Sequence, residues 1–169
     1  MRNIIITLFA LVFSATLLSQ PFYHYDKIGN AEVSQELSGI YLSVRNALKD
    51  RGVNVDRLDV ELDGVYLVDD LSNLTGRPNT LGVTLINGKN TNKKDLILID
   101  RSIDSYFKLV ITMYHEVTHY ITQEGDCNQG LFLFQPNYYE QYNNEATKIV
   151  FSLYVDELAK FIKTYVKKD

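Results

Sequence analysis

The sequence predicts a single α+β domain in which helices flank a small sheet. Apolar residues recur with helical spacing near the N-terminus and again in the last third of the chain. Between about residues 58 and 100 they alternate with polar residues instead, as they do in half-buried strands. The chain has 169 residues, of which 46% are hydrophobic and 22% charged, so it has the size and composition of one globular domain with its own core.

The N-terminal residues differ from the rest of the chain. Arg2 precedes an apolar run from Ile4 to Leu18, and Ser19 follows this run. The pattern is typical of a secretory signal peptide, so we expect residues 1–19 to be removed and residues 20–169 to form one secreted or periplasmic domain. The run is short for a membrane span, and no stable membrane insertion is expected after its removal. An uncleaved N-terminal anchor is the alternative.

The net charge limits the expected binding partners, and the cysteine content limits how the domain can be stabilised. The net charge is −4, and the only basic cluster is the short lysine-rich tail Lys163–Lys168, so nucleic acid is not expected as a partner. Cys127 is the only cysteine, which excludes an internal disulfide. Stability must therefore come from packing or from a bound metal.

The first half of the domain is expected to contain one helix followed by the sheet. Residues 21–30 show no regular pattern, and Ala31–Lys49 carries one apolar stripe that predicts a helix, with Gly52 as its stop. The stripe consists of Val33, Leu37, Ile40, Val44 and Leu48. Alternating segments then predict a mixed or antiparallel sheet of three to four strands, at Leu58–Leu62, Val65–Val68, Leu81–Leu85 and Leu96–Asp100.

Two more helices complete the predicted order of elements. The first runs from about Ile103 to Thr122, and the last runs from near Tyr138 or Glu145 to Val166. Between them lies the irregular stretch EGDCNQGLFLFQPN, residues 124–137. Helix, small sheet, helix, loop and helix in this order is an α+β arrangement.

The helix predicted at Ile103–Thr122 contains the segment HEVTH. Its two histidines, His115 and His119, are four residues apart and therefore lie one turn apart on the same side of a helix. Both imidazoles can reach one zinc ion, and Glu116 is placed to accept a proton from a water held there. This HExxH spacing is the motif of zinc-dependent metalloproteases, with the glutamate as general base.

Helical phase places the two histidines away from the predicted core stripe of their helix. That stripe consists of Tyr106, Leu109, Val110, Met113, Val117 and Tyr120. At 100° per residue, His115 and His119 lie almost opposite it, so we expect them to point toward whatever covers the other side. The same side holds Lys108, Ile111 and Thr122, which we expect to line a cleft.

A zinc hydrolase site has three protein ligands and one open position, but no histidine follows His119. Gly125, which tolerates a positive φ, would end the helix and turn Asp126 back onto the metal. Glu145, near the start of the last helix, is the alternative third ligand. The remaining acceptable donors are Glu140, Glu124, Cys127 and His24.

Around this motif the chain resembles small exported bacterial metallopeptidases of the zincin type. Their motif runs approximately HELGHxxLxxxHG and is followed by Gly-Ile-Met; in that register His115, Glu116 and His119 match two ligands and the base. Asp126 falls at the third histidine, Thr118 replaces a glycine, and Gly130-Leu131-Phe132 replaces Gly-Ile-Met. The resemblance covers about 70 residues from Leu96 onward. A gluzincin-like relation, with Glu145-Ala146 on a later helix, is the competing match.

The resemblance implies a zincin-like fold and an exported zinc metallopeptidase that cleaves a polypeptide substrate. In this reading His115, His119 and Asp126 bind Zn²⁺, and Glu116 is the general base. One strand above the HExxH helix, Leu81–Leu85 or Leu96–Asp100, would hold an extended peptide by edge pairing. The main alternative is a non-catalytic exported binding or interaction domain on a degenerate zincin scaffold, and a hydrolase of a non-peptide amide is a third option.

Overall fold

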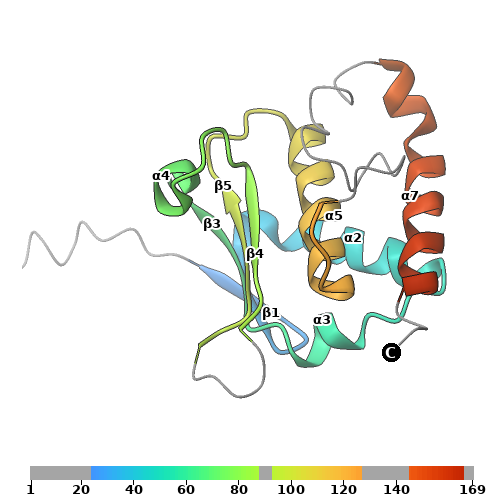
Figure 1. The fold of residues 1–169 in the computed structure, drawn as a ribbon, viewed down its shortest axis with the longest axis horizontal. Helices are drawn as coiled ribbons and strands as arrows, with labels where there is room; N and C mark the ends of the chain where they lie inside the picture. The colour runs from blue at the N-terminus through green and yellow to red at the C-terminus, as the bar shows by residue number, and fades with distance from the viewer. Residues whose placement is uncertain (1–23, 88–92, 127–144, 166–169) are drawn as a thin grey trace, which may run out of the picture.

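The computed structural model describes residues 24–87, 93–126 and 145–165, with the side chains of 145–150 excepted. The protein is α+β, as predicted, with a five-stranded sheet whose one face is covered by helices α2 and α5 (Figure 1). In chain order the elements are β1 (Tyr25–Ile28), β2 (Ala31–Ser34), α2 (Gln35–Asp50), α3 (Asp56–Val60), β3 (Gly64–Val68), α4 (Leu71–Thr75), β4 (Gly82–Leu85), β5 (Leu96–Asp100), α5 (Tyr106–Thr122) and α7 (Glu145–Tyr165).

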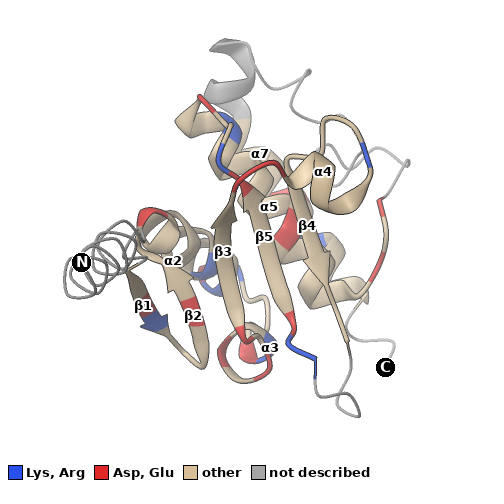
Figure 2. Cartoon of the chain, turned by 90° about the vertical axis from the view of Figure 1, so that its left-hand side faces the viewer, with Lys and Arg blue, Asp and Glu red and all other residues tan. Residues whose placement is uncertain are grey.

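The sheet is mixed, and its strands lie in the order β1-β2-β3-β5-β4, as Figure 2 shows from the face away from α5. Strands β2, β3 and β5 are parallel, whereas β1 and β4 pair antiparallel with β2 and β5. Of the two predicted types, mixed or antiparallel, the sheet is mixed, but the predicted count of three to four strands was wrong. Strand β4 lies at one edge, directly beside α5.

The β1–β2 hairpin lies where the sequence predicted an irregular segment and the start of a helix. Gly29 forms the turn with a φ of +62°, and an added Cβ there would lie 2.7 Å from the carbonyl oxygen of Asp59. Ala31 and Val33 are buried and Glu32 is exposed, so the segment alternates as a strand does. Val33 fits both a strand and the helical stripe, which is why the pattern placed the helix start too early. Helix α2 begins at Gln35.

The segment Leu58–Leu62 is not a strand, because most of it belongs to the short helix α3. The side chain of Asn54 accepts a hydrogen bond from the backbone amide of Asp56 at 2.8 Å and so favours a helical turn. Leu58 and Leu62 are buried and four residues apart, whereas Val60 between them is 64% exposed. Apolar residues at every second position thus fitted a helix turn here as well as a strand.

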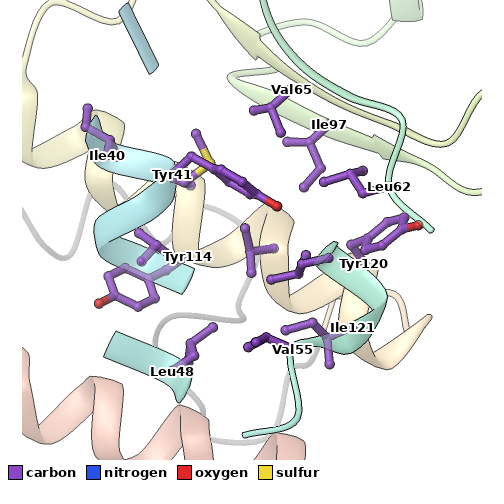
Figure 3. Packing of buried hydrophobic residues seen from close by; sticks show 14 of the residues in the cluster. Ile40, Tyr41, Leu48, Val55, Leu62, Val65, Ile97, Tyr114, Tyr120 and Ile121 are labelled. Carbon is purple, nitrogen blue, oxygen red and sulfur yellow. The ribbon is translucent and has the colours of Figure 1, made fainter. Parts of the chain in front are cut away.

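The hydrophobic core lies between the sheet and the helices (Figure 3). The stripe predicted for α2 is buried in it, and Tyr41 joins that stripe. The Tyr41 ring points from α2 toward Leu62 and Ile97, and its hydroxyl has no hydrogen-bond partner among the described residues. The sheet contributes Val65, Ile97 and Ile99, and α5 contributes Met113, Val117, Tyr120 and Ile121.

Helix α5 contacts strands β4 and β5 of the sheet and the helices α2 and α7. The hydroxyl of Ser105 caps its N-terminus by accepting a hydrogen bond from the amide of Lys108, so the helix starts at Tyr106 rather than Ile103. It ends at Thr122, as predicted. Because other elements cover it on several sides, nearly all of its residues from Ile111 to Ile121 are buried.

Helix α7 begins at Glu145, one of the two predicted starts, and packs beside α5. Its Asp156 carboxylate accepts a hydrogen bond from the Arg51 side chain at 2.5 Å, and Lys163 Nζ donates to the Arg51 carbonyl at 2.9 Å. These contacts hold α7 at the C-terminal end of α2. In the part of the chain that the structure describes, no helix has the length and apolar character needed to cross a membrane.

Candidate metal centre

Three donor atoms converge beside the middle of α5. The Nε2 atoms of His115 and His119 lie 2.9 Å apart, and Oδ1 of Asp126 lies 3.1 and 3.2 Å from them. Around a tetrahedral ion with bonds of about 2.0–2.2 Å, neighbouring donor atoms are about 3.3–3.6 Å apart. The observed triangle is only slightly tighter than that. His115, His119 and Asp126 could therefore hold a metal ion, and within the described residues they form the only such group of three.

The chain brings Asp126 to the histidines by ending α5 one turn after His119. The last turn closes with the amide of Gln123 bonded to the His119 carbonyl at 2.8 Å, and Gln123 itself takes the left-handed conformation with a φ of +58°. Gly125 was predicted to take that positive φ, which was wrong, because Gly125 does not adopt it. The predicted outcome, Asp126 beside the two histidines, is nevertheless what the structure shows.

The contact made by Nδ1 of His119 determines which ring nitrogen carries the proton. Nδ1 lies 2.6 Å from the carbonyl oxygen of Glu124, so it carries the proton and donates it to that oxygen. The Nε2 lone pair is then directed toward His115 and Asp126, as in metal-binding histidines whose other nitrogen is held by a backbone carbonyl. Burial lowers the pKa of His119, but Asp126, Glu116 and the Glu124 carbonyl together raise it by more. Hydrogen bonds from His115 and His119 hold the pKa of Asp126 well below its usual range.

Glu116 lies next to the donor triangle and is only 4% exposed. The hydroxyl of Thr84 in β4 is 2.8 Å from Oε2 of Glu116 and 2.9 Å from its carbonyl oxygen, and it donates to one of them at a time. Burial raises the pKa of Glu116, and the neighbouring His115 and His119 partly offset that rise. A buried carboxylate of raised proton affinity beside a group that could hold a metal ion is suited to act as a general base.

Strand β4 passes so close to Glu116 that it requires a glycine. A Cβ atom added to Gly82 would lie 2.5 Å from Oε1 of Glu116 and 2.7 Å from its Cγ. Neither Gly82 nor Thr84 was predicted from the sequence to be a site residue. A glycine within a strand pattern is the one signal that could have indicated the close approach.

A cleft of about 710 Å³ opens over this group. Its described lining comes from three segments: residues 77–84 with Ile86, the site residues of α5, and residues 123–126. Lys108, Ile111 and Thr122, which were expected to line the cleft, do not, and Ile111 is in the core. Tyr106, expected in the core stripe, is 72% exposed. A one-sided stripe does not describe α5, because β4, β5, α2, α3 and α7 all contact this helix.

The other candidate ligands lie in different places. His24 is exposed and outside the donor group, and Glu124 contributes its carbonyl oxygen. Glu145 is the first residue of α7, but its side chain lies outside the described residues. The remaining positions named from the sequence also lie outside them: the leader 1–19, Cys127 and Glu140.

Comparisons of this chain with protein-family models, with curated proteins and with solved structures found no match.

Proposed function

We propose that the protein is an exported zinc-dependent metallopeptidase with a zincin-like fold. The observation that carries the proposal is the convergence of His115 Nε2, His119 Nε2 and Asp126 Oδ1 beside the buried carboxylate of Glu116. Two imidazole nitrogens and one carboxylate oxygen suit zinc, and three protein donors leave one position open for catalysis. The HExxH motif and the apolar leader support the protease activity and the export, respectively.

Zinc held by this group would supply a Lewis acid that polarises a carbonyl and lowers the pKa of a water near it. Glu116 then removes a proton from the attacking water as its oxygen bonds to the peptide carbonyl carbon. Glu116 passes this proton to the departing nitrogen while the carbon–nitrogen bond breaks, so the carboxylate is regenerated. Thr84 orients the carboxylate for both transfers by its hydrogen bond to Oε2.

A polypeptide is the substrate that the position of β4 supports. Strand β5 lies between β3 and β4, whereas the outer edge of β4 borders the cleft. An extended peptide can add to such an edge through main-chain hydrogen bonds. Of the two strands considered from the sequence, β4 is therefore the one that would hold a peptide. A non-peptide amide would use the same donor group without this pairing.

Zinc analysis and peptide cleavage test the proposal with two variants. Glu116→Gln should keep one zinc per chain and lose at least about a hundredfold in kcat/KM, the usual contribution of a general base. His119→Ala should lose the zinc, and with it the rise in Tm that zinc gives the wild-type protein. Unchanged cleavage by Glu116→Gln would refute the catalytic role. A zinc-free native protein without peptidase activity would indicate the non-catalytic binding domain instead.

The third ligand is tested by the zinc content of Asp126→Ala and Glu145→Ala. Asp126→Ala should lose most of its zinc at micromolar metal, because one of three donors is removed, while Glu145→Ala should keep it. The reverse result would assign the position to Glu145. Full zinc content in both variants would exclude both residues.

A further inference from the structure

The cleft over the candidate metal centre has one Arg or Lys side chain among its described lining residues, Arg77. The other charged lining residues, apart from the histidines, are acidic: Glu116, Glu124 and Asp126. Arg77 is exposed, and no ion pair between described residues includes it. Its positive charge is therefore available to a molecule in the cleft.

The loop that carries Arg77 is held in place by hydrogen bonds on both sides of that residue. Its amide donates to the Thr75 hydroxyl at 3.3 Å, and its carbonyl accepts from the Thr80 hydroxyl at 2.8 Å. The amide of Thr80 also donates to the hydroxyl of Ser72 at 3.1 Å, which ties the loop to α4. A backbone fixed in this way loses little conformational entropy when its side chain binds a ligand.

The position of Arg77 relative to β4 indicates which end of a bound peptide would lie near Arg77. Arg77 precedes the strand, which begins at Gly82 and continues over Glu116 to Leu85. Antiparallel pairing is the more stable form, and a peptide paired in this way with β4 runs opposite to it. The part of the peptide on the C-terminal side of the scissile bond then lies toward Arg77.

We propose that Arg77 binds a carboxylate of the substrate on the C-terminal side of the scissile bond, an inference that rests on the proposed peptidase function. A guanidinium binds a carboxylate through two parallel hydrogen bonds, which gives direction as well as charge. The carboxylate comes from an acidic side chain or from the free C-terminus of a short peptide. The first source describes an endopeptidase with an acidic preference, and the second an enzyme that removes short C-terminal fragments.

The test uses three versions of each cleaved peptide. The first is neutral with an amidated C-terminus, the second has a glutamate in place of a glutamine after the scissile bond, and the third has a free C-terminal carboxylate. Zinc-loaded wild-type protein should cleave the second or the third at least about fivefold faster in kcat/KM than the first, as expected for a partly exposed charge-assisted contact. Which of the two is faster identifies the source of the carboxylate.

The variants assign the preference to Arg77. Arg77→Gln should bring the ratio of acidic to neutral cleavage close to one, and Arg77→Glu should invert it in favour of a lysine-containing peptide. Lys160→Gln is the matched control, since this exposed lysine lies on α7 away from the cleft and should leave the ratio unchanged. Equal cleavage of all three peptides by the wild-type protein would overturn the inference and leave the peptidase function intact.

Peptide affinity separates the two proposals if no cleavage is found. Zinc-loaded Glu116→Gln protein should bind the carboxylate-containing peptides at least about fivefold more tightly than the neutral one, and the added change Arg77→Gln should remove that difference. This result without any cleavage by the wild-type protein would refute the peptidase function but support the role of Arg77. Equal affinities for all three peptides would refute the role of Arg77.

Discussion

The position of Glu116 depends on two residues of β4 that have no reactive group of their own in the proposed chemistry. Thr84 donates a hydrogen bond to the carboxylate, and Gly82 leaves the space that the carboxylate fills. A shift of about 1 Å in a catalytic group can cost a hundredfold in rate. Both are therefore positioning residues for Glu116.

The change Gly82→Ala should separate catalysis from metal binding. The added methyl group would lie within 3 Å of three atoms of the Glu116 side chain, so the carboxylate or the strand must move. We expect a loss of at least about a hundredfold in kcat/KM with zinc content unchanged, because the three donor residues are not displaced.

The matched control for this change is Gly39→Ala in α2, where an added Cβ meets no atom within 4 Å. Alanine is the better helix former, so this variant should keep full activity and gain about 0.5–1 kcal/mol in unfolding free energy. Wild-type activity in Gly82→Ala would show that the close approach of β4 does not position Glu116.

At the scale of elements, a partly buried ion pair joins α2 to the short helix α3. Arg45 Nε donates to Oδ1 of Asp59 at 2.6 Å, and its second nitrogen Nη2 contacts Oδ2. The side chains are only 16% and 28% exposed, so solvent screens the pair less than it would on an open surface. The carbonyl oxygen of Asp59 also accepts a hydrogen bond from the amide of Asn30, which joins the β1–β2 turn to α3. This pair therefore supports the hairpin that the sequence did not predict.

The stabilisation by Asp59 should disappear in acid. The hydrogen bond from Arg45 lowers the pKa of Asp59 in the folded protein below its value of about 3.9 in the unfolded chain. The contribution is thus fully present above pH 3.9 or so and is lost as the pH falls through the lower, folded pKa. Urea unfolding should show Asp59→Asn to be less stable by about 1–3 kcal/mol at pH 7, with a smaller difference at pH 3.

The control for Asp59→Asn is Asp156→Asn on α7, whose carboxylate is half exposed and also pairs with an arginine. Exposed pairs contribute about 0–1 kcal/mol, so this variant should differ less from the wild-type protein at pH 7. A difference for Asp59→Asn that stays constant from pH 7 to pH 3 would contradict an ionic origin.

At the scale of the whole molecule, Tyr41 and Tyr120 are the two tyrosines with no exposed surface among the described residues of the core, and their hydroxyls differ in hydrogen bonding. Tyr120 donates from its hydroxyl to Asp95 at 3.2 Å, next to the point where β5 begins. Tyr41 is equally buried, but its hydroxyl has no partner within the described part of the chain. A buried hydroxyl without a hydrogen bond costs free energy that a phenylalanine ring does not.

Phenylalanine at these two positions should therefore change stability in opposite directions. Tyr41→Phe should raise the unfolding free energy by about 1 kcal/mol, and Tyr120→Phe should lower it by about 1 kcal/mol, measured by urea unfolding of zinc-loaded protein. A loss of stability in Tyr41→Phe would show that its hydroxyl is paired in solution.

Where sequence prediction failed, one apolar pattern fitted two structures. Val33 belongs to a strand although it fits a helical stripe, and Leu58 belongs to a helix although it fits a strand. Short-range features decided the outcome in both cases: the positive φ of Gly29 in the turn before β2, and the hydrogen bond from the Asp56 amide to the Asn54 side chain before α3. The longer helices α2 and α5 were predicted because apolar residues recur over several turns, although the predicted start of each helix was a few residues too early.

The parts of the candidate site that lie within one helix could be predicted from the sequence. The spacing of His115 and His119 requires only helix geometry, and Asp126 was reachable as a candidate because it follows the helix by a few residues. The residues that surround these side chains come from distant parts of the chain and were found only in the folded structure. Gly82 passes close to Glu116, Thr84 donates a hydrogen bond to it, and Arg77 lines the same cleft. All three residues precede Glu116 by more than thirty positions in the sequence. Such contacts depend on strand order, which short-range periodicity does not encode.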